Sequence, residues 1–155
     1  MSVLSGIKRL EKLGFAPFFL AATATGMIAV PIWVASYLGI DGPWAGLASA
    51  HWHGHEMIFG YALAVLGGYL LTRVSWRVLV LLFLAWAAGR VAGLAGTALP
   101  PFLSAPLALL YPAALVHYAG GPFFRAAKRV RSAVPGLLMA GFFLAELIFQ
   151  AGVLG

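Results

Sequence analysis

Cysteine is absent from this sequence of 155 residues, and acidic residues are scarce, with only four Asp and Glu together. Without cysteine the chain forms no disulfide, thiolate metal site or iron–sulfur cluster, and it has no thiol catalysis. Any metal or cofactor must therefore be held by histidine, carboxylate, methionine or tyrosine. The sequence also has no Ser–His–Asp set and no paired carboxylates, so it does not resemble a hydrolase.

Charge of either sign is rare. Only 9% of the residues are charged, whereas a soluble domain usually carries about 25%. Hydrophobic residues make up 63% of the chain and the mean hydropathy is +0.97. These values predict an integral membrane protein, a single transmembrane domain over residues 1–155, with the lipid bilayer as its partner. The net charge of +6 does not indicate nucleic-acid binding, because the basic residues flank apolar runs.

Five apolar runs predict transmembrane helices. Each has roughly the 20 residues that cross a hydrocarbon core. Helices are expected because lipid offers no hydrogen-bond partners to the backbone. The fold class is therefore an all-α membrane bundle with about five helices, at residues 15–38, 53–73, 76–98, 102–120 and 134–154.

The basic residues predict how this bundle is oriented. Lys and Arg precede the first run and occupy the second and fourth connections: Lys8, Arg9, Lys12, Arg73, Arg77, Arg125, Lys128, Arg129 and Arg131. The positive-inside rule then places the N-terminus in the cytoplasm and the C-terminus outside. A signal peptide cleaved after "ATA" (22–24) is an alternative, but the apolar run continues to Leu38 and favours an uncleaved first helix.

Ligand-type side chains crowd the start of the second run, in "HWHGHE" (51–56). In a helix His51 and His55 share a face, and in an extended segment His53 joins them. Imidazole binds copper, zinc and haem iron, so these histidines are candidate metal ligands, with Glu56 as an acceptor that fixes a ring tautomer. The alternative is that they are amphipathic anchors at the membrane surface. The spacing identifies no metal.

Other ionisable groups lie inside the apolar runs and need partners. Arg90 and Glu146 are at similar depths in the third and fifth runs, which predicts a structural ion pair between them. Arg90 is alternatively a partner for an anionic group of a cofactor. His117 is too deep to share one metal with His55, and it either serves a second site or bonds a backbone carbonyl. Two copies in a homodimer could also bring like histidines together.

Small and aromatic residues predict where the runs contact protein. Gly60, Ala64 and Gly68 recur every four residues, so that face of the second run is expected to pack against another helix. The tryptophans are interpreted as interfacial anchors: Trp33, Trp44, Trp52, Trp76 and Trp86.

"HGHEMIFGYALAVLGGYLLT" (53–72) resembles the signature of the NnrS family. "LGFAPFFLAA" (13–22) and "LAWAAGR" (84–90) are similar to flanking segments of that family, so the resemblance covers about residues 13–95. His53, His55 and Glu56 are at signature positions, His51 precedes them, and Arg90 matches the third-span arginine. The resemblance implies bacterial membrane proteins that contain haem and copper and are associated with nitric oxide. Typical members are much longer, so a cofactor that needs ligands from later segments would be lost or completed by a second subunit.

Two kinds of function follow from these observations. The first is a haem- or copper-binding protein of the bacterial inner membrane, in nitric-oxide metabolism or nitrosative-stress tolerance. Its cofactor would be haem b or copper, held by His51, His53, His55 or His117, with Arg90 near the cofactor; covalent c-type haem is excluded by the lack of cysteine. Whether it is an enzyme is open, and any catalysis would be metal-centred redox or gas chemistry. The alternative is a transporter, a channel or an assembly subunit of a respiratory complex that uses Arg90, Glu146 and Glu56.

Overall fold

The computed structural model describes residues 16–40, 42, 47, 49–71, 74–95, 98–126 and 130–154. These ranges are helical and contain no strand, which confirms the predicted all-α class. Using η for a π-helix, the elements are α2 (Ala16–Tyr37), α3 (Ala50–His55), η2 (Glu56–Ala62), α4 (Leu63–Leu70), α5 (Trp76–Ala95), α6 (Pro101–Leu115), η4 (Val116–Gly120), α7 (Gly121–Ala126) and α8 (Val130–Leu154).

Four of the helical stretches are long and apolar enough to cross a membrane, judged by length and composition: Ala16–Tyr37, Trp76–Ala95, Pro101–Arg125 and Ala133–Gly152. The predicted second run differs from these because it is not one α-helix. Residues 50–70 are helical without a break, but α3 changes to the π-helix η2 and then to α4. The change falls directly after the histidine cluster.

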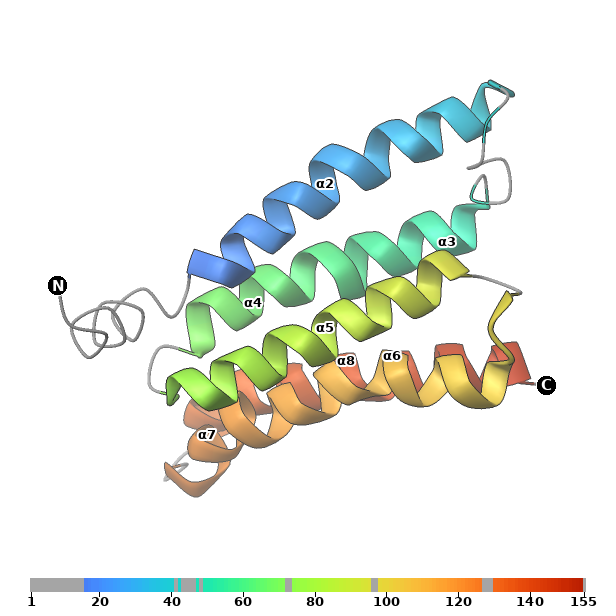
Figure 1. Cartoon of the computed structure of the whole chain (residues 1–155). Helices are drawn as coiled ribbons and strands as arrows, with labels where there is room; N and C mark the ends of the chain where they lie inside the picture. The colour runs from blue at the N-terminus through green and yellow to red at the C-terminus, as the bar shows by residue number, and fades with distance from the viewer. Residues whose placement is uncertain are drawn as a thin grey trace, which may run out of the picture.

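The helices run side by side and alternate in direction (Figure 1). Within this bundle α5 packs on α6 and η2, α8 packs on α6, η4 and α7, and α2 packs on η2 and α4. The start of α3 and the end of α8 lie at one end, and α7 lies at the other (Figure 1). The histidine cluster is therefore close to the last turns of α8.

Three of the described basic residues, Arg77, Arg125 and Arg131, lie at the end of the bundle opposite α3. Arg77 and Arg131 are each one residue inside the start of α5 and α8, and Arg125 is in α7. This arrangement agrees with the orientation expected from the positive-inside rule. The other basic residues used to predict the orientation lie outside the described residues: Lys8, Arg9, Lys12, Arg73, Lys128 and Arg129. Trp44, one of the expected interfacial anchors, also lies outside them.

Local signals explain several helix ends. The Ser49 hydroxyl accepts a hydrogen bond from the Trp52 amide at 3.1 Å and caps the start of α3. Pro101 opens α6, where a missing N–H has no cost. Gly39 follows α2 with φ 70°, a conformation that favours glycine.

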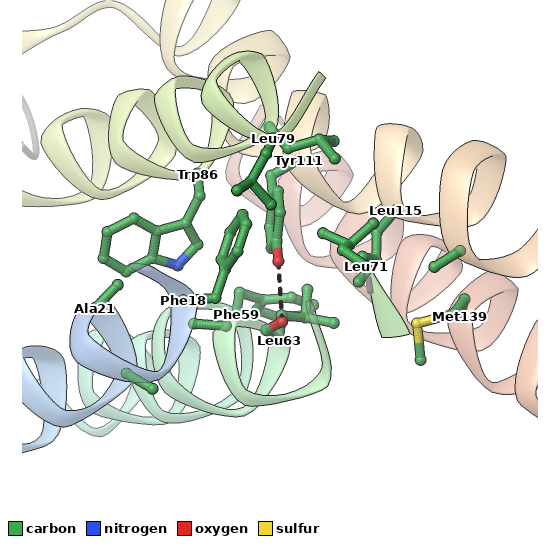
Figure 2. Packing of buried hydrophobic residues seen from close by; sticks show 14 residues of the cluster. Phe18, Ala21, Phe59, Leu63, Leu71, Leu79, Trp86, Tyr111, Leu115 and Met139 are labelled. Atoms are coloured by element: carbon green, nitrogen blue, oxygen red, sulfur yellow. Dashed lines mark hydrogen bonds between the residues drawn. The ribbon is translucent and has the colours of Figure 1, made fainter. Parts of the chain in front are cut away.

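The core is aromatic and lies where α2, α5 and α6 meet the middle of the second run (Figure 2). Phe18 stacks on Tyr111 with ring centroids 5.4 Å apart and meets Phe83 edge-on at 5.9 Å. The strip of Gly60, Ala64 and Gly68 is buried, as predicted, and a Cβ on Gly68 would come 3.1 Å from the Phe19 ring. Small residues here let the helices approach closely.

The orientation can be tested with single-cysteine variants, because the natural chain has no cysteine. Tyr37 is exposed near the end of α2 and Arg125 is exposed in α7. We expect a membrane-impermeant maleimide to label Tyr37→Cys on intact spheroplasts, and to label Arg125→Cys only after permeabilisation, because the basic end faces the cytoplasm. The reverse pattern would contradict the orientation.

Candidate functional site

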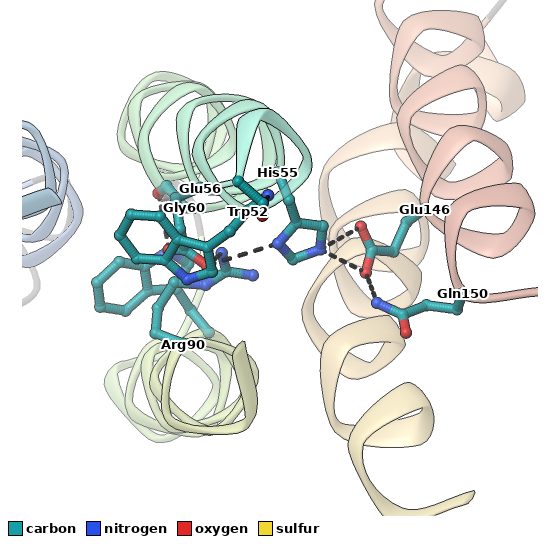
Figure 3. A network of polar contacts seen from close by, with 9 residues as sticks. Trp52, His55, Glu56, Gly60, Arg90, Glu146 and Gln150 are labelled. Carbon is teal, nitrogen blue, oxygen red and sulfur yellow. Dashed lines mark hydrogen bonds and ion pairs between the residues drawn. The ribbon is translucent and has the colours of Figure 1, made fainter. Parts of the chain in front are cut away.

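His55 is buried at the end of α3 and points toward α8 (Figure 3). Its Nε2 lies 3.0 Å from Glu146 Oε1 and 3.1 Å from Glu146 Oε2. Glu146 is 0% exposed, and its Oε1 also accepts a hydrogen bond from Gln150 Nε2 at 2.7 Å. Gln150 stands one helical turn after Glu146, so α8 itself holds the carboxylate in place.

Glu56 extends this contact to α5. Arg90 Nη1 donates a hydrogen bond to Glu56 Oε1 at 2.8 Å, and the same oxygen lies 3.5 Å from His55 Nδ1. Arg90, Glu56, His55, Glu146 and Gln150 thus form one connected set, which we call the polar chain (Figure 3). Isolated charges are costly inside a bilayer, so grouping them lowers the cost of each.

The polar chain corrects the predicted ion pair between Arg90 and Glu146. Both residues belong to the chain, but Arg90 contacts Glu56, and Glu146 contacts His55 and Gln150. Arg90 and Glu146 are at similar depths in their helices, but similar depth does not determine which helices are neighbours. In the fold α5 packs on α6 and η2, whereas α8 packs on α6, η4 and α7, so the second run supplies the partner of each charge.

The π-helix η2 begins at Glu56, directly after His55. Hydrogen bonding shifts from i−4 to i−5 in a π-helix, and such segments are frequent at functional sites. Two side chains from other helices bond carbonyls in this region: Trp86 Nε1 donates to the Gly60 carbonyl at 3.0 Å, and the Tyr111 hydroxyl donates to the Leu63 carbonyl at 3.1 Å. A carbonyl without a partner is costly in lipid, so these contacts support the irregular helix.

Glycines make room for these contacts. A Cβ on Gly67 would collide with the Tyr111 hydroxyl. A Cβ on Gly60 would come 2.9 Å from Glu56 Oε2, and one on Gly93 would come 2.9 Å from Glu56 Oε1. The carboxylate of Glu56 is therefore enclosed by two glycines, one on its own helix and one on α5.

The other histidines do not join His55. His51 is exposed, and His53 stacks on Trp33 of α2 with ring centroids 4.2 Å apart and planes 19° apart. The Nδ1 of His53 and the Nε1 of Trp33 are buried without a hydrogen-bond partner. His117 is exposed in η4, edge-on to Tyr118 at 4.8 Å, and α7, which follows η4, lies at the far end of the bundle from α3 (Figure 1).

The arrangement expected from an extended segment, with His51, His53 and His55 on one side, is therefore absent from the described part of the chain. Within it no three His, Asp or Glu side chains form a group that could hold a metal ion. The reason is the helix that begins at Ala50: positions two apart point to nearly opposite sides, so His53 faces α2 while His55 faces α8.

A cavity of about 400 Å³ lies beside His55, between α3, α5, α6 and α8. Its lining is mostly apolar, with small residues on α5 and α6, and it includes Trp52, His55, Gly93, Ala108, Phe149 and Gln150. Of the predicted ligands, only His55 lines this space. An imidazole at the edge of an apolar cavity is suited to hold a cofactor that is itself largely apolar.

Sequence reasoning missed three residues of this site. Gln150 was detectable, since it is a polar residue in an apolar run four positions after Glu146. Trp86 was interpreted as an interfacial anchor but is buried and bonds the π-helix. Tyr111 shows the same role, and no pattern in its own segment reveals which carbonyl it meets.

The family model described as NnrS protein matches residues 9–155 of the chain. Comparisons with curated proteins and with solved structures found no match. The match includes every residue of the polar chain and extends the resemblance, which covered about residues 13–95, to the fourth and fifth apolar runs.

The support of the π-helix can be tested by removing one donor at a time. We expect Trp86→Phe and Tyr111→Phe each to lower the free energy of unfolding by about 0.5–2 kcal/mol, because a buried carbonyl loses its partner in lipid. Tyr69→Phe is the matched control, since it removes the same hydroxyl from a side chain that is 69% exposed. Unfolding in mixed detergent micelles measures the difference. Equal stability of Tyr111→Phe and Tyr69→Phe would contradict this role.

The pairing within the polar chain can be tested by double-mutant cycles. The coupling energy between Glu56→Gln and Arg90→Gln is expected to be about 1–3 kcal/mol, because the two side chains are in direct contact. The cycle of Arg90→Gln with Glu146→Gln should give a smaller coupling, since other residues lie between them. A larger coupling energy in the second cycle would contradict this pairing and would support the ion pair between Arg90 and Glu146 that their depths predict.

Proposed function

The chain belongs to the NnrS family, and on that premise we propose that it is a haem-binding membrane protein of nitric-oxide metabolism, with His55 as the residue that holds the iron. The observation that carries this proposal is the position of His55 at the edge of the 400 Å³ cavity. A role in nitrosative-stress tolerance in the bacterial inner membrane is part of the same proposal.

The cavity suits a haem in size and chemistry. Ligand pockets in proteins usually measure about 300–1,000 Å³ and have mainly apolar walls with few polar groups. Here the polar groups are those of His55, Ser104 and Gln150, together with the indole of Trp52. On α5 the lining residues are small, namely Gly89, Ala92 and Gly93, so this helix takes little space from a ligand.

The contacts of His55 also suit an iron ligand. A histidine that binds metal through one ring nitrogen usually donates its other N–H to a carboxylate, which fixes the tautomer and the ring orientation. His55 has a carboxylate near each nitrogen, Glu146 at Nε2 and Glu56 at Nδ1. Iron binding at either nitrogen would require the carboxylate beside that nitrogen to move away, and the other nitrogen would keep its acceptor.

The remaining residues of the polar chain act through His55 in this proposal. Gln150 orients Glu146, and Arg90 neutralises the charge of Glu56. Arg90 does not line the cavity beside His55, so we assign it to Glu56 rather than to a haem propionate. A bound haem would supply gas binding and one-electron chemistry, while the apolar walls exclude water.

Copper, the second metal implied by the family resemblance, fits the described residues less well. A copper site needs several imidazole or thioether ligands close together. His53 faces α2, His55 faces α8 and His51 is exposed, and the described residues contain no group of three His, Asp or Glu that could hold a metal ion. We therefore propose no copper site within a single copy of this chain.

The proposal predicts a haem absorption spectrum that depends on His55. Protein purified after expression with haem and copper supplied should show a reduced-minus-oxidised haem band, and His55→Ala should lose it because the iron ligand is gone. Glu146→Ala should weaken haem binding by about 10–100-fold through the loss of the acceptor. His51→Ala is the control and should bind haem normally, because His51 is exposed and does not line the cavity. A folded protein without haem, or full haem binding by His55→Ala, would contradict the proposal.

A further inference from the structure

A second cavity, of about 190 Å³, lies between α2, α3 and α5. Its walls are almost entirely apolar and include Ala24, Ile28 and Ile32 of α2 and Leu94 of α5, with Glu56 and Arg90 at its inner side. We call it the α2 cavity. His55 does not line it.

The α2 cavity opens sideways toward the bilayer. Ala24 is exposed, Ile28 is 59% exposed and Leu94 is 55% exposed, so the rim of the cavity belongs to the apolar outer surface that a bilayer would cover. The cavity beside His55 differs, because it reaches Leu99 and Pro101, which precede and begin α6 at the end of the bundle. The two cavities therefore face different surroundings.

Trp52 is the residue that both cavities share among their described lining residues. On α5 the adjacent residues Gly93 and Leu94 line one cavity each. The indole of Trp52 thus forms the side-chain part of the wall between them. Its Nε1 is buried without a hydrogen-bond partner, so no polar contact of that atom fixes the side chain in one rotamer.

We propose that the α2 cavity is a lateral entrance through which a small, uncharged, lipid-soluble molecule passes from the bilayer, past Trp52, to the cavity beside His55. The proposal rests on the proposed function for its destination, a cofactor at His55. The passage itself is defined by the two cavities and by the indole between them.

The size and polarity of the α2 cavity define what can enter. An apolar cavity of about 150 Å³ in a protein can hold benzene or xenon, so a space of this size takes molecules no larger than a small ring. Ions are excluded because bringing a charge into the hydrocarbon region is costly, and Arg90 already donates to Glu56. Diatomic gases are small, uncharged and lipid-soluble, and they fit this class.

The test blocks the entrance from the lipid side. Ala24→Phe places a ring in the mouth of the α2 cavity without changing the polar chain. Ala113→Phe is the matched control, because Ala113 is also exposed on a transmembrane helix and lines neither cavity. Both variants and the wild type are studied in lipid nanodiscs, with carbon monoxide rebinding to haem after photolysis as one measurement and xenon binding by ¹²⁹Xe NMR as the other.

We expect Ala24→Phe to slow bimolecular carbon monoxide rebinding about tenfold, which corresponds to about 1.4 kcal/mol in the barrier, and to remove the xenon signal of the α2 cavity. Ala113→Phe should change neither. The xenon measurements on the cavity beside His55 use protein prepared without haem, in which Ser104→Phe fills that cavity and assigns the second xenon signal. In the same preparation Trp52→Ala should speed xenon exchange between the two cavities, because it removes the indole between them.

Each other outcome overturns the entrance. Loss of the xenon signal with unchanged rebinding in Ala24→Phe would mean that the gas enters elsewhere. A xenon signal seen in detergent and absent in nanodiscs would mean that an acyl chain occupies the α2 cavity. A protein that binds no haem would contradict the proposed function but not the entrance. The entrance would then be tested by xenon alone: if Ala24→Phe leaves the rate of xenon exchange into the cavity beside His55 unchanged, the entrance is rejected.

Discussion

The contact between His55 and Glu146 is the interaction on which the rest of the site depends. It joins the second apolar run to the last one, and both side chains are buried, with His55 7% and Glu146 0% exposed. Because an unpaired charge is costly in hydrocarbon, His55 and Glu146 contact each other, and each also contacts one further polar side chain. Gln150 donates a hydrogen bond to the carboxylate of Glu146, and Glu56 lies between His55 and Arg90 and contacts both.

The π-helix and the aromatic core place His55 where this contact can form. The helical hydrogen bonding changes at Glu56, and Trp86 and Tyr111 bond carbonyls of the irregular region from two other helices. Tyr111 also stacks on Phe18, so the same residue belongs to the core and to the support of the site. The packing of the core and the hydrogen bonding of the irregular helix therefore share Tyr111.

The two cavities lie on different sides of the second run and differ in their surroundings. One lies on the α6 and α8 side of the second run and contains the imidazole, and the other lies on the α2 side and faces lipid. Between them stand the indole of Trp52 and the pair of Glu56 and Arg90. A membrane protein that handles small uncharged molecules can use the bilayer as its source of ligand, and the charged groups in the wall of the α2 cavity, Glu56 and Arg90, are already paired with each other.

The sequence by itself determined the membrane class, the helical fold and the residues that carry chemistry. The hydropathy of a segment reflects the free energy of transferring its residues from water to lipid, and this free energy depends on that segment alone. For the same reason Arg90, Glu56 and Glu146 were recognised as groups that need partners. Which partners they have was decided by the tertiary structure, because depth along a helix says nothing about which helices are neighbours. Helical geometry from Ala50 onward sent His53 toward α2 and His55 toward α8, so one histidine, and not three, lies at the cavity.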